Sequence, residues 1–121
     1  MTRPFALIIE DDAQLSDIFS IALQNQFTTE VIYDGGEALQ RLKQVVPDLV
    51  ILDLNLPVVP GSTILALIRQ DERLKATRVI LATADDRQAE LLDNKADIVL
   101  LKPISPFQLR TLAERFAPVK N

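Results

Sequence analysis

Polar side chains directly follow four apolar segments of the sequence, and their types suit one kind of chemistry. These residues are Glu10 and Asp11, Asp53 and Asn55, Thr83, and Lys102. Carboxylates that lie close together repel one another unless a cation joins them. A lysine and a hydroxyl group can hold the oxygens of a phosphoryl group, and a carboxylate can attack phosphorus to form an acyl phosphate. The combination therefore indicates phosphoryl transfer to an aspartate.

The sequence contains no cysteine and no histidine. The first absence excludes disulfides, zinc–thiolate sites and thiol chemistry. The second excludes Ser-His and Cys-His catalysis and a phosphohistidine on this chain. A metal site built from carboxylate and carbonyl oxygens suits a hard ion, and Mg²⁺ better than zinc.

Alternating strands and helices must bring the polar residues together. Apolar or β-branched runs predict strands at 5–9, 28–33, 49–52, 79–82 and 98–101. Apolar residues at helical spacing predict helices at 13–26, 38–46, from Gly61 onward, at 86–94 and at 105–116, with residues 34–37 as a turn before the second helix. This alternation favours a parallel sheet covered on both faces, with the more polar segment 28–33 at an edge. Since ligands bind at the carboxyl ends of such strands, we expect the polar residues to gather there.

Each of these residues also has a purely structural interpretation. An aspartate after a strand is most often a turn former or a helix N-cap, and we assign that role to Asp12, Asp34 and Asp86. Thr83 would then simply end a strand, and Lys102 would be a solvated surface lysine. The joint pattern favours function, because four strand ends each carry a residue type that one chemistry needs.

Composition narrows the class of protein further. The 121 residues are 48% hydrophobic and 25% charged with a net charge of −4, which is typical of one globular domain. An acidic chain is repelled by nucleic-acid phosphates, so we expect no direct nucleic-acid binding. The apolar stretch near the N-terminus is too short for a signal peptide or a membrane span, so we expect no membrane association and a cytoplasmic location.

The sequence resembles the receiver domain of bacterial two-component response regulators over essentially its whole length, 1–121. The motifs that carry the resemblance are Ile9-Glu10-Asp11-Asp12, Leu52-Asp53-Leu54-Asn55-Leu56-Pro57 with Gly61 eight residues past the aspartate, Ala82-Thr83-Ala84, and Leu101-Lys102-Pro103. The resemblance implies an α/β, flavodoxin-like, doubly wound fold with five parallel strands in the order 2-1-3-4-5 and five helices. It also implies a cis peptide bond between Lys102 and Pro103.

The resemblance further implies a role for each matching residue. Asp53 is expected to accept a phosphoryl group from a phosphohistidine on a histidine kinase or histidine phosphotransfer protein. Mg²⁺ is the expected cofactor, held by Asp11, Asp53 and the main-chain carbonyl of Asn55, with Glu10 acting through water. The phosphoryl oxygens are expected to contact Thr83, Lys102 and the main-chain N–H of Ala84. Asn55 and Asp85 flank the site and are expected to influence hydrolysis.

The resemblance thus implies a signalling switch and not an enzyme acting on other substrates. We expect the domain to phosphorylate itself from a phosphodonor and slowly to dephosphorylate itself. Homodimerisation on phosphorylation is a further expectation. The alternative is a degenerate receiver, a protein-interaction module that is never phosphorylated. A free-standing phosphohydrolase is disfavoured because Asn55 stands where an Asp-x-Asp pattern needs its second aspartate. A dinucleotide-binding protein is disfavoured because no Gly-x-Gly-x-x-Gly follows a strand.

Three single residues and one loop segment depart from the usual receiver pattern. Val99 stands where an aromatic residue usually transmits the signal, and Ile98 beside it replaces a common polar residue. Lys95 replaces a common glycine before the last strand. The segment Val58-Val59-Pro60 makes the loop after Asp53 unusually apolar, which fits either a core contact by one valine or a docking spot for a kinase helix.

Overall fold

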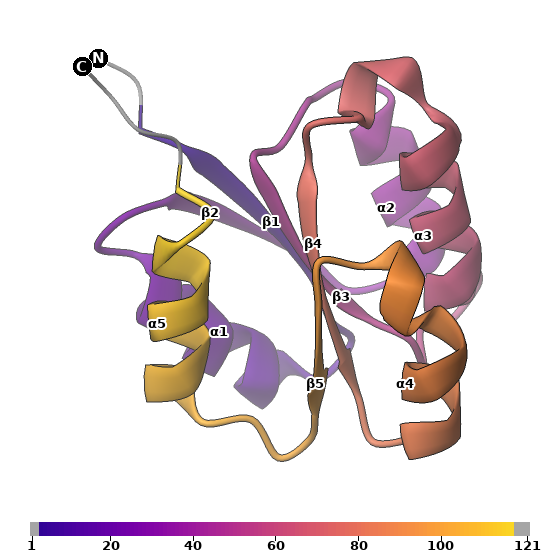
Figure 1. Ribbon diagram of the computed structural model, residues 1–121. Coiled ribbons are helices and arrows are strands. Elements are labelled where there is room, and N and C mark those ends of the chain that lie inside the picture. The colour runs from indigo at the N-terminus through magenta and orange to yellow at the C-terminus, as the bar shows by residue number, and fades with distance from the viewer. Residues whose placement is uncertain (1–2, 118–121) are drawn as a thin grey trace.

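A five-stranded parallel sheet in the order β2-β1-β3-β4-β5 forms the centre of the computed structural model, which describes residues 3–117 (Figure 1). The strands are β1 (Phe5–Ile9), β2 (Thr28–Ile32), β3 (Leu49–Asp53), β4 (Arg78–Thr83) and β5 (Ile98–Leu101). The helices are α1 (Ala13–Leu23), α2 (Gly35–Leu42), α3 (Gly61–Gln70), α4 (Asp86–Leu92) and α5 (Pro106–Glu114). The flavodoxin-like α/β fold, with its strand order and five helices, is therefore confirmed. The ends of the expected domain, residues 1–2 and 118–121, lie outside the described residues.

The helices cover both faces of the sheet, α1 and α5 on one side and α2, α3 and α4 on the other (Figure 1). Successive residues of the central strands point alternately into two apolar cores, one on each face of the sheet. Ile8 and Ile51 pack with Phe19 and Leu109 on the side of α1 and α5, and the strand residues next to them pack under α2 and α3. All five residues of β3 are buried, as expected for the middle strand of a sheet covered on both faces. Among the described residues, no helix is both long and apolar enough to cross a membrane.

Helix ends differ most from the sequence expectation. The helix α2 begins at Gly35 and not at residue 38, and it ends at Leu42. Residues 34–37 are therefore a capped first turn and not a separate turn, because the Asp34 side chain accepts the N–H of Glu37 (2.8 Å). Short 3₁₀ turns at Glu72–Leu74 and Asp93–Lys95 were not expected from the sequence pattern.

Short polar side chains cap α1, α2, α4 and α5, whereas Pro60 precedes α3 without a side-chain cap bond. The caps at Asp12 and Asp34 are as assigned from sequence. Asp12 accepts the N–H groups of Gln14 and Leu15, and Asp34 caps α2. The assignment of Asp86 is wrong, because the preceding residue Asp85 accepts the N–H groups of Arg87 and Gln88 at the start of α4. Asp86 is the first residue of that helix, where its negative charge interacts favourably with the positive end of the helix dipole.

Gly61 allows α3 to start directly against β3. A Cβ atom at this position would lie 2.2 Å from the Asp53 carbonyl oxygen and 2.6 Å from the Leu54 Cα atom. Both are main-chain atoms that cannot move aside, so we expect Gly61→Ala to lower the free energy of unfolding by about 3 kcal/mol. Gly36→Ala is the matched control, since its Cβ would meet only side chains, at 3.1 Å or more; urea denaturation should show a change of about 1 kcal/mol or less for it. Equal losses for both variants would contradict this explanation.

Asp97 joins β4 and β5 at the end of the sheet opposite the strand exits. It accepts the N–H of Val79 (2.7 Å) and pairs with Arg69 (3.0 Å) and Arg78 (3.1 Å). Burial alone would raise the pKa of this carboxyl, but the Val79 N–H and the two guanidinium groups hold the pKa below its ordinary value.

The lowered pKa of Asp97 means that its carboxylate stabilises the fold at neutral pH and loses this effect as the pH falls below about 3.8. We expect Asp97→Asn to lower the free energy of unfolding by about 1.5 kcal/mol at pH 7, a modest figure because the ion pairs are partly exposed. Urea denaturation near pH 3 should show a smaller difference from the parent protein. The same loss at both pH values would rule out the ionised carboxylate as the cause.

Candidate functional site

The polar residues at the strand ends meet at one edge of the sheet, as expected for parallel strands. Asp53 is the last residue of β3 and Thr83 the last of β4, and Glu10 and Lys102 directly follow β1 and β5. In the register of the sheet, Asp53 pairs with Ala82, and Thr83 with Leu101. The nucleophile candidate therefore lies on the central strand, with the other groups on its neighbours.

Three carboxylates form the acidic part of the site. Glu10, Asp11 and Asp53 each offer an oxygen, and these oxygens all lie within 4.8 Å of one another. Glu10 and Asp53 are almost fully buried, at 1% and 3% exposure, whereas Asp11 is exposed. Buried carboxylates at this distance carry a large electrostatic cost unless a cation compensates them.

Lys102 supplies a positive charge inside this cluster. Its ammonium group donates to Glu10 Oε1 (2.8 Å) and lies 3.5 Å from Asp53 Oδ1. The Lys102 main-chain N–H donates to the Thr83 carbonyl (2.8 Å), which holds the end of β5 against β4. The Lys102–Pro103 peptide bond is cis, as expected. The direct ion pair with Glu10 was not expected from the sequence, where the two residues are far apart.

Burial and pairing shift the pKa values of both Glu10 and Lys102. Burial raises the pKa of Glu10 to about 7, helped by the charge on Asp53 and opposed by the hydrogen bond from Lys102. Burial would lower the pKa of Lys102, but the hydrogen bond to Glu10 and the charge of Asp53 together raise it above its ordinary value. Lys102 is therefore a permanent cation at neutral pH.

Main-chain N–H groups fix the carboxylates in place. The Asn55 N–H donates to Asp53 Oδ1 (3.2 Å), and the Asp12 N–H donates to Glu10 Oε2 (3.2 Å). The same oxygen of Asp53, Oδ1, therefore lies near the Lys102 ammonium group and accepts the N–H of Asn55.

Thr83 is fully buried at the end of β4, and its hydroxyl oxygen accepts the N–H of Asp85 (3.0 Å). This bond orients the hydroxyl so that its hydrogen can serve another acceptor. Ala84, between them, is exposed. Asp85 has a structural role that the sequence pattern did not indicate, since it links the Thr83 hydroxyl to the start of α4.

The donor set fits a hard divalent cation. Carboxylate oxygens of Glu10, Asp11 and Asp53 converge, with the main chain of Asn55 beside them. Magnesium takes oxygen ligands of this kind and usually keeps several waters, which the exposed position of Asp11 permits. The arrangement can therefore hold an ion next to the buried oxygen of Asp53.

Comparison with known proteins shows the family of the chain. The family model described as the response regulator receiver domain matches residues 6–114. The chain belongs to this family. The receiver domain is 34% identical to the DNA-binding response regulator MtrA of Mycolicibacterium paratuberculosis over 111 residues, which are 88% of this chain and 48% of MtrA. The receiver domain thus spans about half the length of that relative.

Solved structures agree with this assignment. The chemotaxis response regulator CheY4 of Vibrio cholerae matches 95% of the receiver domain and 99% of its own chain, with a TM-score of 0.85 and 25% identity. The BeF3-activated receiver domain of DrrB, a Thermotoga maritima protein, matches 96% of this chain and 97% of its own, with a TM-score of 0.85 and 26% identity. Receiver domains are signalling domains of two-component systems and not typical enzymes.

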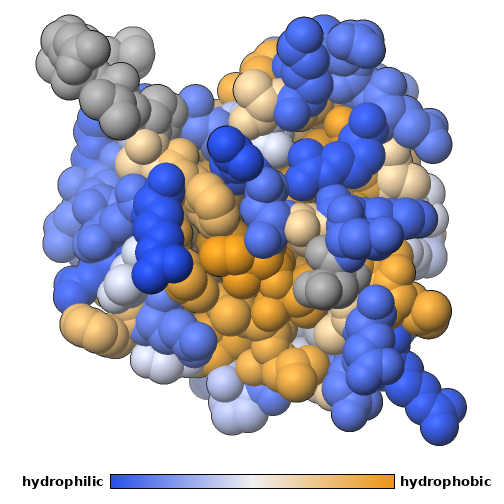
Figure 2. Space-filling view, viewed as in Figure 1, coloured by the Kyte–Doolittle hydropathy of each residue, from blue (hydrophilic) through white to orange (hydrophobic). Residues whose placement is uncertain are grey.

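The receiver domain lacks the usual aromatic residue of β5. Val99 is half-buried against the core below α2 and α3. A hollow of about 290 Å³ lies beside it, lined by Ala89, Glu90, Val99 and Leu101. Apolar surface is visible over β5 between α4 and α5 (Figure 2), where Leu101 is 51% exposed. The small valine thus leaves open space between α4 and the sheet edge. Lys95 lies in the 3₁₀ turn before β5, and its carbonyl accepts a hydrogen bond from Arg69.

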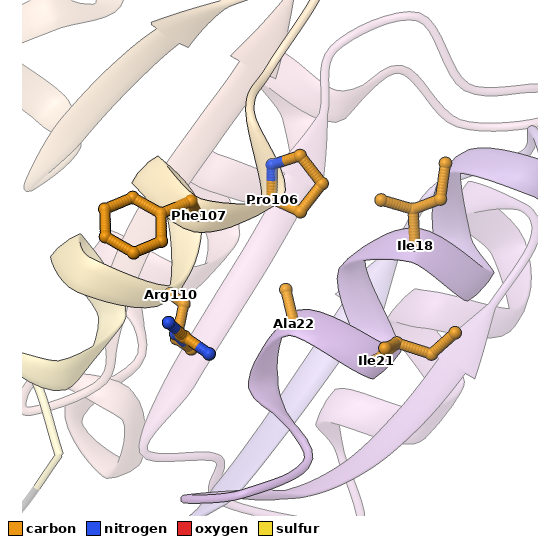
Figure 3. A pocket seen from close by; sticks show the side chains of 6 residues that line it. All are labelled: Ile18, Ile21, Ala22, Pro106, Phe107 and Arg110. Carbon is orange, nitrogen blue, oxygen red and sulfur yellow. The ribbon is translucent and has the colours of Figure 1, made fainter.

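An apolar groove runs between α1 and α5 of the receiver domain. Its volume is about 320 Å³, and it is lined by Ile18, Ile21, Ala22, Pro106, Phe107 and Arg110 (Figure 3). Ile21 and Phe107 are 63% and 68% exposed. The two helices start shortly after Asp11 and Lys102, so this groove adjoins the strand ends that carry the site.

Proposed function

We propose that the receiver domain accepts a phosphoryl group on Asp53 from a phosphohistidine on a histidine kinase or histidine phosphotransfer protein. The observation that carries the proposal is the buried Asp53 carboxylate, 3.5 Å from the Lys102 ammonium group and clustered with Glu10 and Asp11. In the reaction, an Asp53 oxygen attacks phosphorus, the N–P bond of the phosphoimidazole breaks, and the donor histidine takes up a proton. Attack of water on the acyl phosphate later returns Asp53 and releases inorganic phosphate.

The residues around Asp53 hold the transferred group in two ways: some donate hydrogen bonds to the phosphoryl oxygens, and others would bind the metal ion. Lys102, whose ammonium group carries three N–H donors, donates to a phosphoryl oxygen, and the Thr83 hydroxyl donates to another. The main-chain N–H of Ala84 provides a third donor. Asp11, Asp53 and the main-chain carbonyl of Asn55 would hold Mg²⁺, with Glu10 reaching it through water. The ion, when bound, neutralises the carboxylates and the charge on the phosphoryl oxygens.

The donor protein must reach Asp53 over the surrounding surface. The groove between α1 and α5 is lined by exposed apolar side chains (Figure 3). Its helices begin just after strand ends that carry the site, and exposed apolar patches commonly mark protein contacts. We assign this groove to a helix of the phosphohistidine protein. A cytoplasmic location and self-association on phosphorylation complete the proposal.

The test uses acetyl phosphate, a small donor that needs no partner. Intact-mass measurement should show one added phosphoryl group in the presence of MgCl₂ and none in the presence of EDTA, and the group should be lost with time. Mg²⁺-dependent addition that maps to Asp53 supports the proposal. If a folded protein gains no phosphoryl group, the proposal is overturned and the alternative, an unphosphorylated interaction module, is favoured. The valine at position 99, in place of the usual aromatic residue, would then be a further sign of a degenerate receiver.

A further inference from the structure

The loop between β3 and α3 contains one strained residue, Val58. Its φ of 73° lies in the left-handed region, and Val59 N–H donates to the Pro57 carbonyl (2.9 Å). Together these define the strained form of the γ-turn, which is rare. A β-branched residue is the least suited to this conformation. The Val58 side chain is 80% exposed, so packing within the chain does not compensate the strain.

Contacts of the neighbouring main chain hold the turn in this conformation. The Pro57 carbonyl also accepts the N–H of Gly35 (3.0 Å), so the turn rests on the first residue of α2. The approach is so close that a Cβ atom at Gly35 would lie 2.0 Å from the Val59 carbonyl oxygen. The strain is therefore imposed by the fold around the loop.

The two ends of the loop are fixed as well. Gly61 N–H donates to the Leu54 carbonyl (3.1 Å), and Gly61 lies directly against the Asp53 main chain. Between Leu54 and Pro57, the first residue of the turn, there are only Asn55 and Leu56. Val59 lies directly against Gly35, and Gly61 lies against the Asp53 main chain, so the residues after Val58 have no free space. A change of the turn at Val58 would therefore move the Pro57 carbonyl away from the Gly35 N–H, and Asn55 and Leu56 would take up the shift.

Asn55 links this loop to the site, since its N–H donates to Asp53 Oδ1 (3.2 Å). We propose that Val58 is a positioning residue: its left-handed turn sets the path of the Asn55 main chain, and thereby the oxygen that Asn55 presents to the divalent ion. This inference rests on the proposed function, because it takes the Asn55 carbonyl as an ion ligand. The turn, and not the valine side chain, carries the effect.

Two backbone changes and one side-chain change test the inference. Val58→Pro forbids the positive φ, and insertion of a glycine after Val58 releases the turn while keeping the side chain. Val58→Gly removes the side chain but adopts the turn without strain. Isothermal titration calorimetry with MgCl₂ gives the dissociation constant of each unphosphorylated protein, with circular dichroism to verify folding.

We expect the proline and insertion variants to bind Mg²⁺ at least tenfold more weakly than the parent protein. Their phosphorylation rates from acetyl phosphate at saturating MgCl₂ should stay within about threefold, because only the ion ligand is displaced. Val58→Gly should keep the parent affinity within about twofold and melt a few degrees higher, since the strain is gone. A glycine inserted after Val46, an exposed valine before β3 at the other end of that strand, should leave Mg²⁺ binding unchanged.

The outcomes separate this inference from the proposed function. Parent-like Mg²⁺ affinity in the folded proline or insertion variant would overturn the positioning role while leaving phosphorylation of Asp53 intact. Equal weakening in Val58→Gly would assign the effect to the side chain and overturn it too. If the proline variant does not fold, the Mg²⁺ affinity of the insertion variant provides the test of the positioning role. A parent protein that is not phosphorylated by acetyl phosphate would instead contradict the proposed function.

Discussion

Replacement of Asp53 by asparagine is expected to abolish phosphorylation by acetyl phosphate. The amide is a far weaker nucleophile than the carboxylate, and the remaining acidic residues are not placed to substitute for it: Glu10 is paired with Lys102, and Asp11 is exposed. Intact-mass measurement with MgCl₂ should show only unmodified protein. Asn and Asp are nearly isosteric, and loss of one negative charge from the cluster should leave the variant folded, with an equal or higher melting temperature.

Asp48→Asn is the matched control for this variant. Asp48 is also an aspartate adjoining β3, but it lies at the other end of the strand, where it accepts the N–H of Phe5 (2.7 Å). This variant should be phosphorylated at the parent rate. Addition of a phosphoryl group to Asp53→Asn would show that another residue is the acceptor.

Replacement of Lys102 by methionine is expected to slow phosphorylation by about 10²- to 10³-fold, the usual effect of removing one preorganised donor from a transition state. Methionine keeps the apolar length of the side chain but supplies no charge for the developing negative charge on the phosphoryl oxygens. The variant also leaves Glu10 and Asp53 without their cation, so it should melt at a lower temperature at pH 8 than at pH 6.

The variant Lys102→Arg tests whether the positive charge alone is sufficient or whether the compact shape of the ammonium group is also needed. Arginine keeps the positive charge, but its planar group is larger than the ammonium group that fits between Glu10 and Asp53. It should restore the melting temperature more fully than the phosphorylation rate. A Lys102→Met rate within threefold of the parent protein would show that Lys102 does not contact the transferred group.

The strands were predictable because apolar runs alternate with segments of helical periodicity, whereas their order came only from the resemblance to receiver domains. The gathering of polar residues at one edge followed from the parallel arrangement of the strands. Boundaries were less accurate where two neighbouring residues offer the same group. Asp85 and Asp86 both suit a helix cap, and only the structure shows that Asp85 accepts the N–H groups of Arg87 and Gln88. Likewise, Gly35 and Gly36 suggested a turn, although they are the start of α2.

Other features depend on contacts that no local pattern encodes. Valine favours extended backbone, so nothing in the sequence indicates that Val58 adopts a positive φ; the requirement comes from Gly35 across the loop. For the neighbouring Val59, the expected contact of one valine with the core is confirmed, since it packs against the core on the side of α2 and α3. The ion pair between Glu10 and Lys102 joins residues 92 positions apart, which only the finished sheet brings together.

That long-range pair has a consequence for how the protein matures. Glu10 follows the first strand of the sheet, whereas Lys102 follows the fifth and is therefore synthesised only after all five strands. A chain that ends before β5 would thus carry Glu10 and Asp53 without the Lys102 ammonium group that lies between them. If Asp53 is the acceptor, as proposed, we expect a chain that stops before β5 to be phosphorylated far more slowly than the folded domain.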